Sequence, residues 1–207
     1  MELPLFAKPK SSDMKGIRFL ALSVFSAAFL SFTTENKKLI VIDAGHGGTD
    51  LGSNREGIYE KNVVLSISKE IQKFNNTQDA YEVVLTRDYD TESTLNDRTA
   101  LINKLNPEMV ISLHLNSSPR SESGRSGQEI FIQNTEASRK LAEKISQRFS
   151  PSLIVGDRNL HILRESKVLA VLVELGFINS TKDRQYLTSE KGQQEIARKF
   201  TEVFKEY

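Results

Sequence analysis

The chain has 207 residues, with 28 Lys and Arg against 27 Asp and Glu, which gives a formal net charge of +1. This length suits one domain with a full hydrophobic core, and the balanced charge gives no electrostatic reason to expect a nucleic-acid partner. The sequence has no cysteine, so disulfides, thiolate metal sites and cysteine nucleophiles are excluded, and any metal must be bound by His, Asp or Glu.

The first 35 residues differ in composition from the rest. Lys8, Lys10 and Lys15 precede an apolar run from Ile17 to Phe32, and this run contains the small residues 26–28. That order is typical of a secretory signal, and the run is short for a membrane span of about 20 apolar residues. We predict that residues 1–35 form a signal peptide, or alternatively an uncleaved N-terminal anchor. The protein is then exported, to the periplasm or cell envelope, and residues 36–207 form its catalytic domain.

The rest of the chain alternates predicted strands and helices. In chain order, the pattern predicts a strand at 37–44, a loop at 45–59, a helix at 60–74, a strand at 81–88, a helix through 101–105 with a capping box at Thr94 and Asp97, strands at 109–116 and 129–133, a helix at 135–149, a short extended segment at 159–164, a strand at 168–177, and helices around 183–187 and from 192 onward. The strands are apolar throughout, which is typical of a parallel sheet covered on both faces. We predict an α/β fold: a single domain with a mostly parallel twisted sheet of five to six strands and helices on both faces.

Four ionisable side chains lie where functional groups gather in such a fold. In open α/β sheets these groups collect at the carboxyl ends of the strands. His46 follows the first predicted strand, His114 and Glu174 lie near the ends of the third and last, and Glu60 begins the first helix. The chain has only three histidines, so the position of two of them at strand ends supports the interpretation that they share a functional site. We expect all four side chains at one edge of the sheet.

Two histidines and one glutamate form a familiar ligand set for catalytic zinc, which keeps a fourth position open for water. We predict that His46, Glu60 and His114 bind the metal and that Glu174 acts as the general base. The glycines around His46 would let the backbone turn sharply and leave room above the metal. Each residue also has a plainer interpretation: a loop histidine, a strand-end histidine, a helix N-terminal charge, and for Glu174 a buried ion pair with Arg164.

Ordered motifs extend this interpretation over nearly all of the chain from Leu39 onward: IVIDAGHGGTDLG, EKNVVLSISKEI, LTRD, LNDRTALIN, SLHLNSS and VLVELGFINS. Together they resemble the zinc-dependent N-acetylmuramoyl-L-alanine amidases of the type-3 family, which cut peptidoglycan. The resemblance implies one zinc per chain, held by His46, Glu60 and His114, with Glu174 as the catalytic carboxylate. It implies cleavage of the amide between the lactyl group of N-acetylmuramic acid and L-alanine, in cell-wall remodelling or daughter-cell separation.

The resemblance also bears on control and partners. Some members of the family carry a helix, in the loop after the second histidine, that blocks the site until a partner removes it. Here that loop, Ser117–Gly127, is too short for such a helix. We expect an open site on a monomer, with control supplied elsewhere, for example by a protein activator. Peptidoglycan is the expected partner, and no nucleic acid is expected.

Other polar residues have weaker sequence signals. Asn116 lies beside His114 and is a candidate substrate contact. Arg87 and Arg98 are interpreted as structural ion-pair or capping residues rather than substrate contacts. His161 has no motif around it and is interpreted as a surface or hydrogen-bonded histidine.

Two further functions compete with the amidase. A zinc peptidase that cuts within the stem peptide would use the same metal chemistry, and the ligand set alone does not separate the two. A catalytically silent wall-binding protein, or an activator of another hydrolase, would be expected to have lost a ligand or the base. All four residues are present, which argues against a silent protein.

Overall fold

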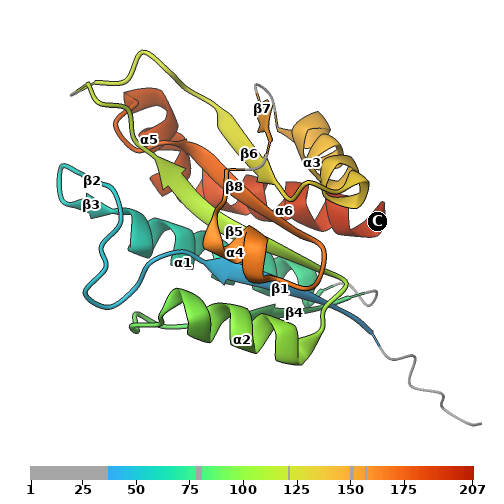
Figure 1. Cartoon of the computed structure of the whole chain (residues 1–207). Coiled ribbons are helices and arrows are strands. Elements are labelled where there is room, and N and C mark those ends of the chain that lie inside the picture. Colours follow the sequence, from blue (N-terminus) through green and yellow to red (C-terminus); the bar gives the residue numbers. More distant parts are fainter. Residues whose placement is uncertain (1–36, 78–80, 121, 150–151, 157) are drawn as a thin grey trace, which may run out of the picture. The chain divides into compact units, whose positions relative to one another are not determined.

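A six-stranded sheet organises the computed structural model, which describes residues 37–77, 81–120, 122–149, 152–156 and 158–207 (Figure 1). The predicted signal peptide or anchor at residues 1–35 lies outside the described residues. Within the described residues, none of the helices has both the length and the apolar character needed to cross a membrane.

The sheet has the strand order β4-β1-β5-β8-β6-β7. Strands β4, β1, β5 and β8 are mutually parallel, β6 pairs antiparallel with β8, and β7 pairs parallel with β6. A separate two-stranded hairpin, β2-β3, precedes the first helix. The strand bounds are β1 Lys38–Ala44, β2 Asn54–Arg55, β3 Ile58–Tyr59, β4 Tyr81–Leu85, β5 Met109–Asn116, β6 Gln128–Ile132, β7 Ser152–Val155 and β8 Ala170–Phe177.

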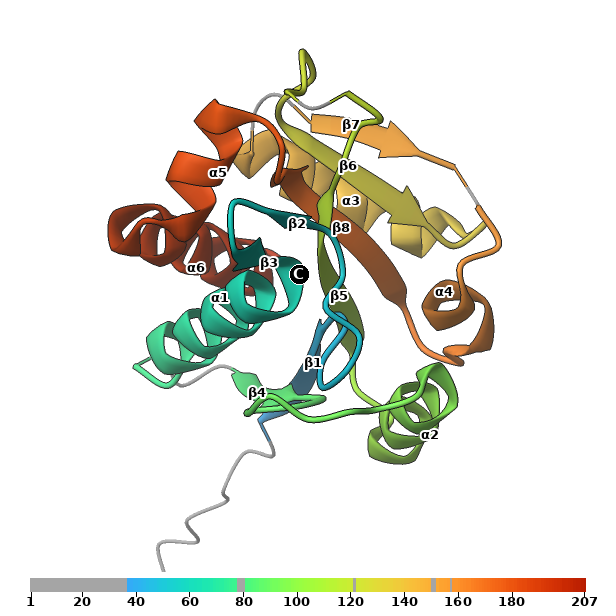
Figure 2. The same ribbon diagram turned by 90° about the vertical axis from the view of Figure 1, so that its left-hand side faces the viewer.

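Helices cover both faces of this sheet, as Figure 2 shows from the side. One face carries α1 (Glu60–Asn75), α3 (Glu136–Arg148), α5 (Thr181–Thr188) and α6 (Glu190–Lys205). The opposite face carries α2 (Leu95–Leu105) and α4 (His161–Glu165). The predicted fold class is therefore confirmed.

Strand β1 shows why the strands read as continuous apolar runs. Successive side chains of a strand point to opposite faces. Ile40 and Ile42 pack into the core under α1, whereas Val41 between them packs with Ile102 of α2. Both faces are buried, so an alternation of polar and apolar residues would leave polar groups in a core.

Three local features differ from the sequence prediction. Residues 161–165 form the helix α4 where an extended segment was expected, because Ile162 and Leu163 both pack into the core between α2 and the sheet. The loop at 45–59 contains the β2-β3 hairpin, and β7 adds an edge strand that was not predicted. These elements have two to five residues, too few for a periodic pattern to show. The predicted capping box of Thr94 and Asp97 is present at the start of α2.

Candidate metal and catalytic site

The segment after β1 turns sharply and places His46 at the edge of the sheet. His46 itself has φ 60°, in the left-handed region that L-residues rarely adopt, and Gly47 and Gly48 continue the turn with φ 130° and 58°. Arg98 stabilises this turn by donating hydrogen bonds to the carbonyl oxygens of Ala44 and His46. The left-handed conformation of His46 is unfavourable in free energy, and these hydrogen bonds offset that cost while fixing the orientation of the imidazole.

His46, Glu60 and His114 converge at this edge. His46 Nε2 lies 2.9 Å from Glu60 Oε1, His114 Nδ1 lies 3.1 Å from the same oxygen, and the two ring nitrogens are 3.2 Å apart. The three potential ligand atoms therefore form a nearly equilateral triangle. The two rings meet edge to face, 78° apart, so each presents one nitrogen to the same point.

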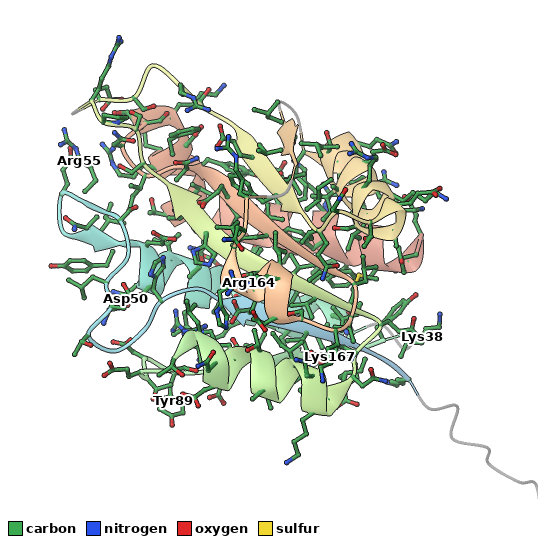
Figure 3. All side chains as sticks on the ribbon, viewed as in Figure 1. Lys38, Asp50, Arg55, Tyr89, Arg164 and Lys167 are labelled. Carbon is green, nitrogen blue, oxygen red and sulfur yellow. The ribbon has the colours of Figure 1, made fainter. Side chains whose placement is uncertain are left out.

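The triangle fits the chemistry of zinc. Ligand atoms of tetrahedral zinc, with bonds of about 2.0–2.1 Å, lie about 3.3 Å apart, close to the three distances seen here. Two imidazoles and one carboxylate are also the donor set of hydrolytic zinc sites. His46 Nδ1 donates to Asp50 Oδ2 at 2.8 Å, so its other nitrogen, Nε2, is the one directed at Glu60 and the candidate ligand atom. Asp50 lies at the end of the sheet where the loops after β1 and β4 run (Figure 3).

Glu60 is the most buried member of the group, with a relative exposure of 2%. Its two carboxylate oxygens accept hydrogen bonds from the backbone N–H groups of Ser53 and Leu115, at 2.8 and 2.9 Å. Burial alone would raise the pKa of Glu60, but hydrogen bonds from His114 and His46 outweigh it and lower that pKa. The carboxylate is therefore ionised and fixed in place, as a metal ligand must be.

Glu174 lies beside the triangle, on the neighbouring strand. In the register of β5 and β8 it is the direct partner of His114. Burial raises the pKa of its carboxyl to about 7, against a weaker opposing effect of His114. Its Oε2 atom is buried and has no hydrogen-bond partner among the described residues. A carboxyl whose pKa is brought close to neutrality and which keeps a free oxygen is suited to proton transfer.

A buried ionic cluster supports the site from within the sheet. Asp43 pairs with Arg98 at 2.8 Å and accepts hydrogen bonds from Ser112 and Thr86, each at 2.7 Å. Burial opposes ionisation of Asp43, but the charge of Arg98 and these hydrogen bonds together lower its pKa. Arg87 donates to the carbonyl oxygens of Ala44, Gly45 and Lys61. The predicted structural roles of Arg87 and Arg98 agree with these contacts.

Gly45 is required because the His114 ring packs directly against it. A Cβ atom at this position would lie 2.3 Å from His114 Cε1, far inside van der Waals contact. The backbone of Gly45 is tied to the same strand, since its N–H donates to the Leu113 carbonyl at 3.1 Å. The glycine thus allows the two histidine-bearing segments to approach each other closely.

Asn116 lies two residues beyond His114, but its amide is already engaged. It donates to Glu129 Oε2 at 2.7 Å, and its oxygen accepts from the Ser117 N–H at 2.8 Å. Glu129 is in turn the register partner of Glu174 on β6 and forms an ion pair with Arg125. Asn116 therefore helps to hold a second carboxylate next to Glu174, and a substrate contact through its amide would have to compete with these bonds.

Two other expectations have clear outcomes. Arg164 binds Glu165, Asn159 and His161, so the structure gives no ion pair between Arg164 and Glu174. Asp50 was not placed in the candidate site from the sequence, although it stands in the GHGGTD motif four residues after His46 and is hydrogen-bonded to that residue. A carboxylate near a candidate histidine ligand is the signal that could have identified it.

Comparison with known proteins gives matches over most of the chain. Residues 40–205 match a protein family described as N-acetylmuramoyl-L-alanine amidase. An uncharacterized protein of Bacillus subtilis, YqiI, is 33% identical over 86% of this chain and 88% of its own length. The sporulation-specific N-acetylmuramoyl-L-alanine amidase of the same species is 31% identical over 77% of this chain, which covers 64% of that longer protein.

Solved structures show the same fold. The N-acetylmuramoyl-L-alanine amidase of Clostridium difficile 630 superposes with a TM-score of 0.77 at 29% identity, over 83% of this chain and 97% of that one. The catalytic domain of CwlV, an N-acetylmuramoyl-L-alanine amidase of Bacillus (Paenibacillus) polymyxa, gives a TM-score of 0.75 at 31% identity, over 82% of this chain and 97% of that one.

Proposed function

Because the chain belongs to the N-acetylmuramoyl-L-alanine amidase family, we propose that it is a zinc-dependent hydrolase that cuts the amide between the muramoyl lactyl group and L-alanine of peptidoglycan. His46, Glu60 and His114 hold the zinc in this proposal. The observation that carries it is the triangle of ligand atoms, with edges of 2.9, 3.1 and 3.2 Å, beside Glu174, whose Oε2 atom has no hydrogen-bond partner among the described residues.

Zinc bound at this site would polarise the amide carbonyl and the attacking water. Glu174 accepts the proton of that water as it attacks, and then delivers the proton to the leaving nitrogen of L-alanine. Its burial keeps the pKa near neutrality, so the same carboxyl can both accept and donate the proton. Asp50 keeps the His46 ring oriented through its hydrogen bond, and the pair of Asp43 and Arg98 keeps the turn that carries this ring in position.

The reaction products distinguish the proposed amidase from the alternative, a zinc peptidase that acts within the stem peptide. The protein would be incubated with purified peptidoglycan, and the masses of the soluble fragments measured. An amidase releases intact stem peptides that begin with a free L-alanine amine and leaves unsubstituted glycan. Shortened stems attached to glycan would instead place the cut within the peptide and refute the proposed bond.

We also infer that the protein acts in the cell envelope, because its substrate lies there. Export by residues 1–35, cleaved or retained as an anchor, belongs to this proposal. Fractionation of cells that express the full chain, with N-terminal sequencing of the mature protein, tests it. A protein recovered in the cytosol with residues 1–35 intact would contradict export.

Control of the site is a further part of the proposal. The structure of one relative, the CwlD amidase of Clostridioides difficile, was determined in complex with the GerS lipoprotein. For the present chain, whose described residues between 117 and 127 contain no helix, we expect a monomer with an open site. A monomer that is active alone on peptidoglycan supports this expectation, and activity that requires an added protein shows that an activator is needed.

A further inference from the structure

Four residues form a row across the sheet beside the metal site. In the strand registers, His114 of β5 pairs with Glu174 of β8. Glu174 pairs in turn with Glu129 of β6, and Glu129 pairs with Leu153 of β7. Register partners have their side chains on the same face of a sheet, and Figure 2 shows β5, β8, β6 and β7 side by side in this order. The row therefore leads from a proposed zinc ligand, past the proposed base, to the edge of the sheet.

A hollow of about 410 Å³ lies at the outer end of this row. Its lining includes Glu129 and Leu153 from the row, together with Arg125 from the loop that precedes β6. Leu153 is 54% exposed, although it is apolar. Neighbouring strands lie about 4.8 Å apart, so Glu129, two strands away from His114, is about 10 Å from it. The hollow therefore begins within reach of a substrate that is bound at the metal site.

Arg125 supplies a positive charge to this hollow. Its side chain is 61% exposed, and its guanidinium lies over the Phe177 ring, 4.9 Å from the ring centroid. The Nη2 atom donates to Glu129 Oε1, and this oxygen is the only hydrogen-bond acceptor of the guanidinium among the described residues. A guanidinium has five N–H donors. Most of these donors are therefore available to a ligand, while the aromatic ring and the ion pair hold the group in place.

The charge of Arg125 indicates which part of the substrate lies in the hollow. The sugars of peptidoglycan are uncharged once the lactyl carboxyl is in amide linkage, whereas the stem peptides carry free carboxylates. A guanidinium binds a carboxylate through paired N–H donors. Two extended residues span about 7 Å, and a side chain adds to this length. A carboxylate on the residue after L-alanine can therefore reach Arg125 when the amide to be cut lies at the metal site.

We propose that the row from His114 to Leu153 forms the floor of a subsite for the stem peptide, and that Arg125 binds a carboxylate of the residue that follows L-alanine. The inference rests on the proposed amidase function, because it takes a muramoyl-peptide as the ligand. Asn116 donates to the second oxygen of Glu129 at 2.7 Å, so Glu129 is fixed where it orients the guanidinium. Arg125 then determines which substrates bind, and it takes no part in the proton transfer.

The test compares two ligands that differ only in charge. Both are N-acetylmuramoyl-L-alanyl-glutamate, with the glutamate carboxylates either free or converted to carboxamides. Calorimetry on the zinc-loaded protein in a Glu174→Gln background reports the affinity for each uncleaved ligand. We expect the carboxylate form to bind roughly three- to tenfold more tightly than the carboxamide form, because the ion pair is charge-assisted but partly exposed. In Arg125→Met, which removes the charge but keeps an apolar chain against Phe177, the ratio of the two affinities should fall to about one.

The matched control is Arg120→Met, which removes one positive charge from an exposed position in the same loop. Its affinity ratio should stay at the value found without the substitution. The inference is overturned if Arg125→Met keeps that ratio, if Arg120→Met loses it equally, or if Arg125→Met weakens both ligands by the same factor, as a purely structural role would. An affinity loss in Arg125→Met that grows with the number of sugars would assign the hollow to the glycan and also overturn it. Because binding is measured without turnover, failure of the wild-type protein to release free L-alanine amines would refute the amidase function alone.

Discussion

Replacing Gly45 with alanine should disable zinc binding without unfolding the protein. The new Cβ would lie 2.3 Å from Cε1, 2.6 Å from Nε2 and 2.7 Å from Nδ1 of His114. Ordinary contact begins at 3.4 Å, so the ring or the turn must move by about 1 Å, whereas zinc–ligand distances tolerate only about 0.2 Å. Disturbing residues that merely orient a ligand costs about 10–100-fold in metal affinity. We therefore expect zinc to bind at least about 100-fold more weakly.

The matched control for this substitution is Gly124→Ala. No atom lies within 4 Å of a Cβ built at Gly124, and its φ is outside the left-handed region. Zinc affinity would be measured by competition with a coloured chelator, and stability by urea unfolding of the metal-free proteins. Equal zinc affinity in the Gly45→Ala variant, the control and the wild type would refute the placement of His114 in the metal site.

Three further predictions follow from the contacts at the site. Glu174→Gln should keep zinc but lower kcat by about 10²–10⁴-fold; near-normal turnover of a zinc-loaded variant would exclude this carboxyl as the base. Arg98→Met leaves a buried carboxylate unpaired, so urea unfolding should show a loss of about 3–5 kcal/mol, against at most about 0.5 kcal/mol for Arg198→Met in an exposed helical ion pair; equal losses would contradict the reasoning. Burial opposes protonation of His46, but the Glu60 carboxylate outweighs it and raises the His46 pKa to about 9 in the metal-free protein. Zinc must displace that proton, so between pH 7 and 8.5 its apparent affinity should rise about tenfold per pH unit; chelator competition that shows no pH dependence would exclude the ion pair.

The sequence predicted the sheet and the close placement of His46, Glu60 and His114 because both depend on strong patterns. Central parallel strands are buried on both faces, so β1 and β5 are recognisable as continuous apolar runs. Polar residues at their carboxyl ends must meet at one edge, which is why His46 and His114 could be placed together. Glu60 followed from its position at the start of a clearly periodic helix.

The remaining features depend on contacts that no local pattern reveals. The helix α4 has five residues and forms because Ile162 and Leu163 fill the space between α2 and the sheet. The role of Arg98 depends on its meeting Asp43 across 55 positions of sequence. His161 was interpreted as a surface or hydrogen-bonded histidine; its Nδ1 atom contacts Arg164, whereas its Nε2 atom is buried and has no hydrogen-bond partner within the described part of the chain.

The central claim is that one zinc ion at His46, Glu60 and His114 supports amide hydrolysis. The most direct measurement is the metal content of the purified protein together with its release of L-alanine amines from peptidoglycan, before chelation, after chelation and after zinc is restored. We predict one zinc per chain, loss of L-alanine amine release on chelation and recovery of that release with zinc. A Glu60→Gln variant should bind no zinc and release no L-alanine amines under any of these conditions. Undiminished release from a protein that contains no metal would contradict the account.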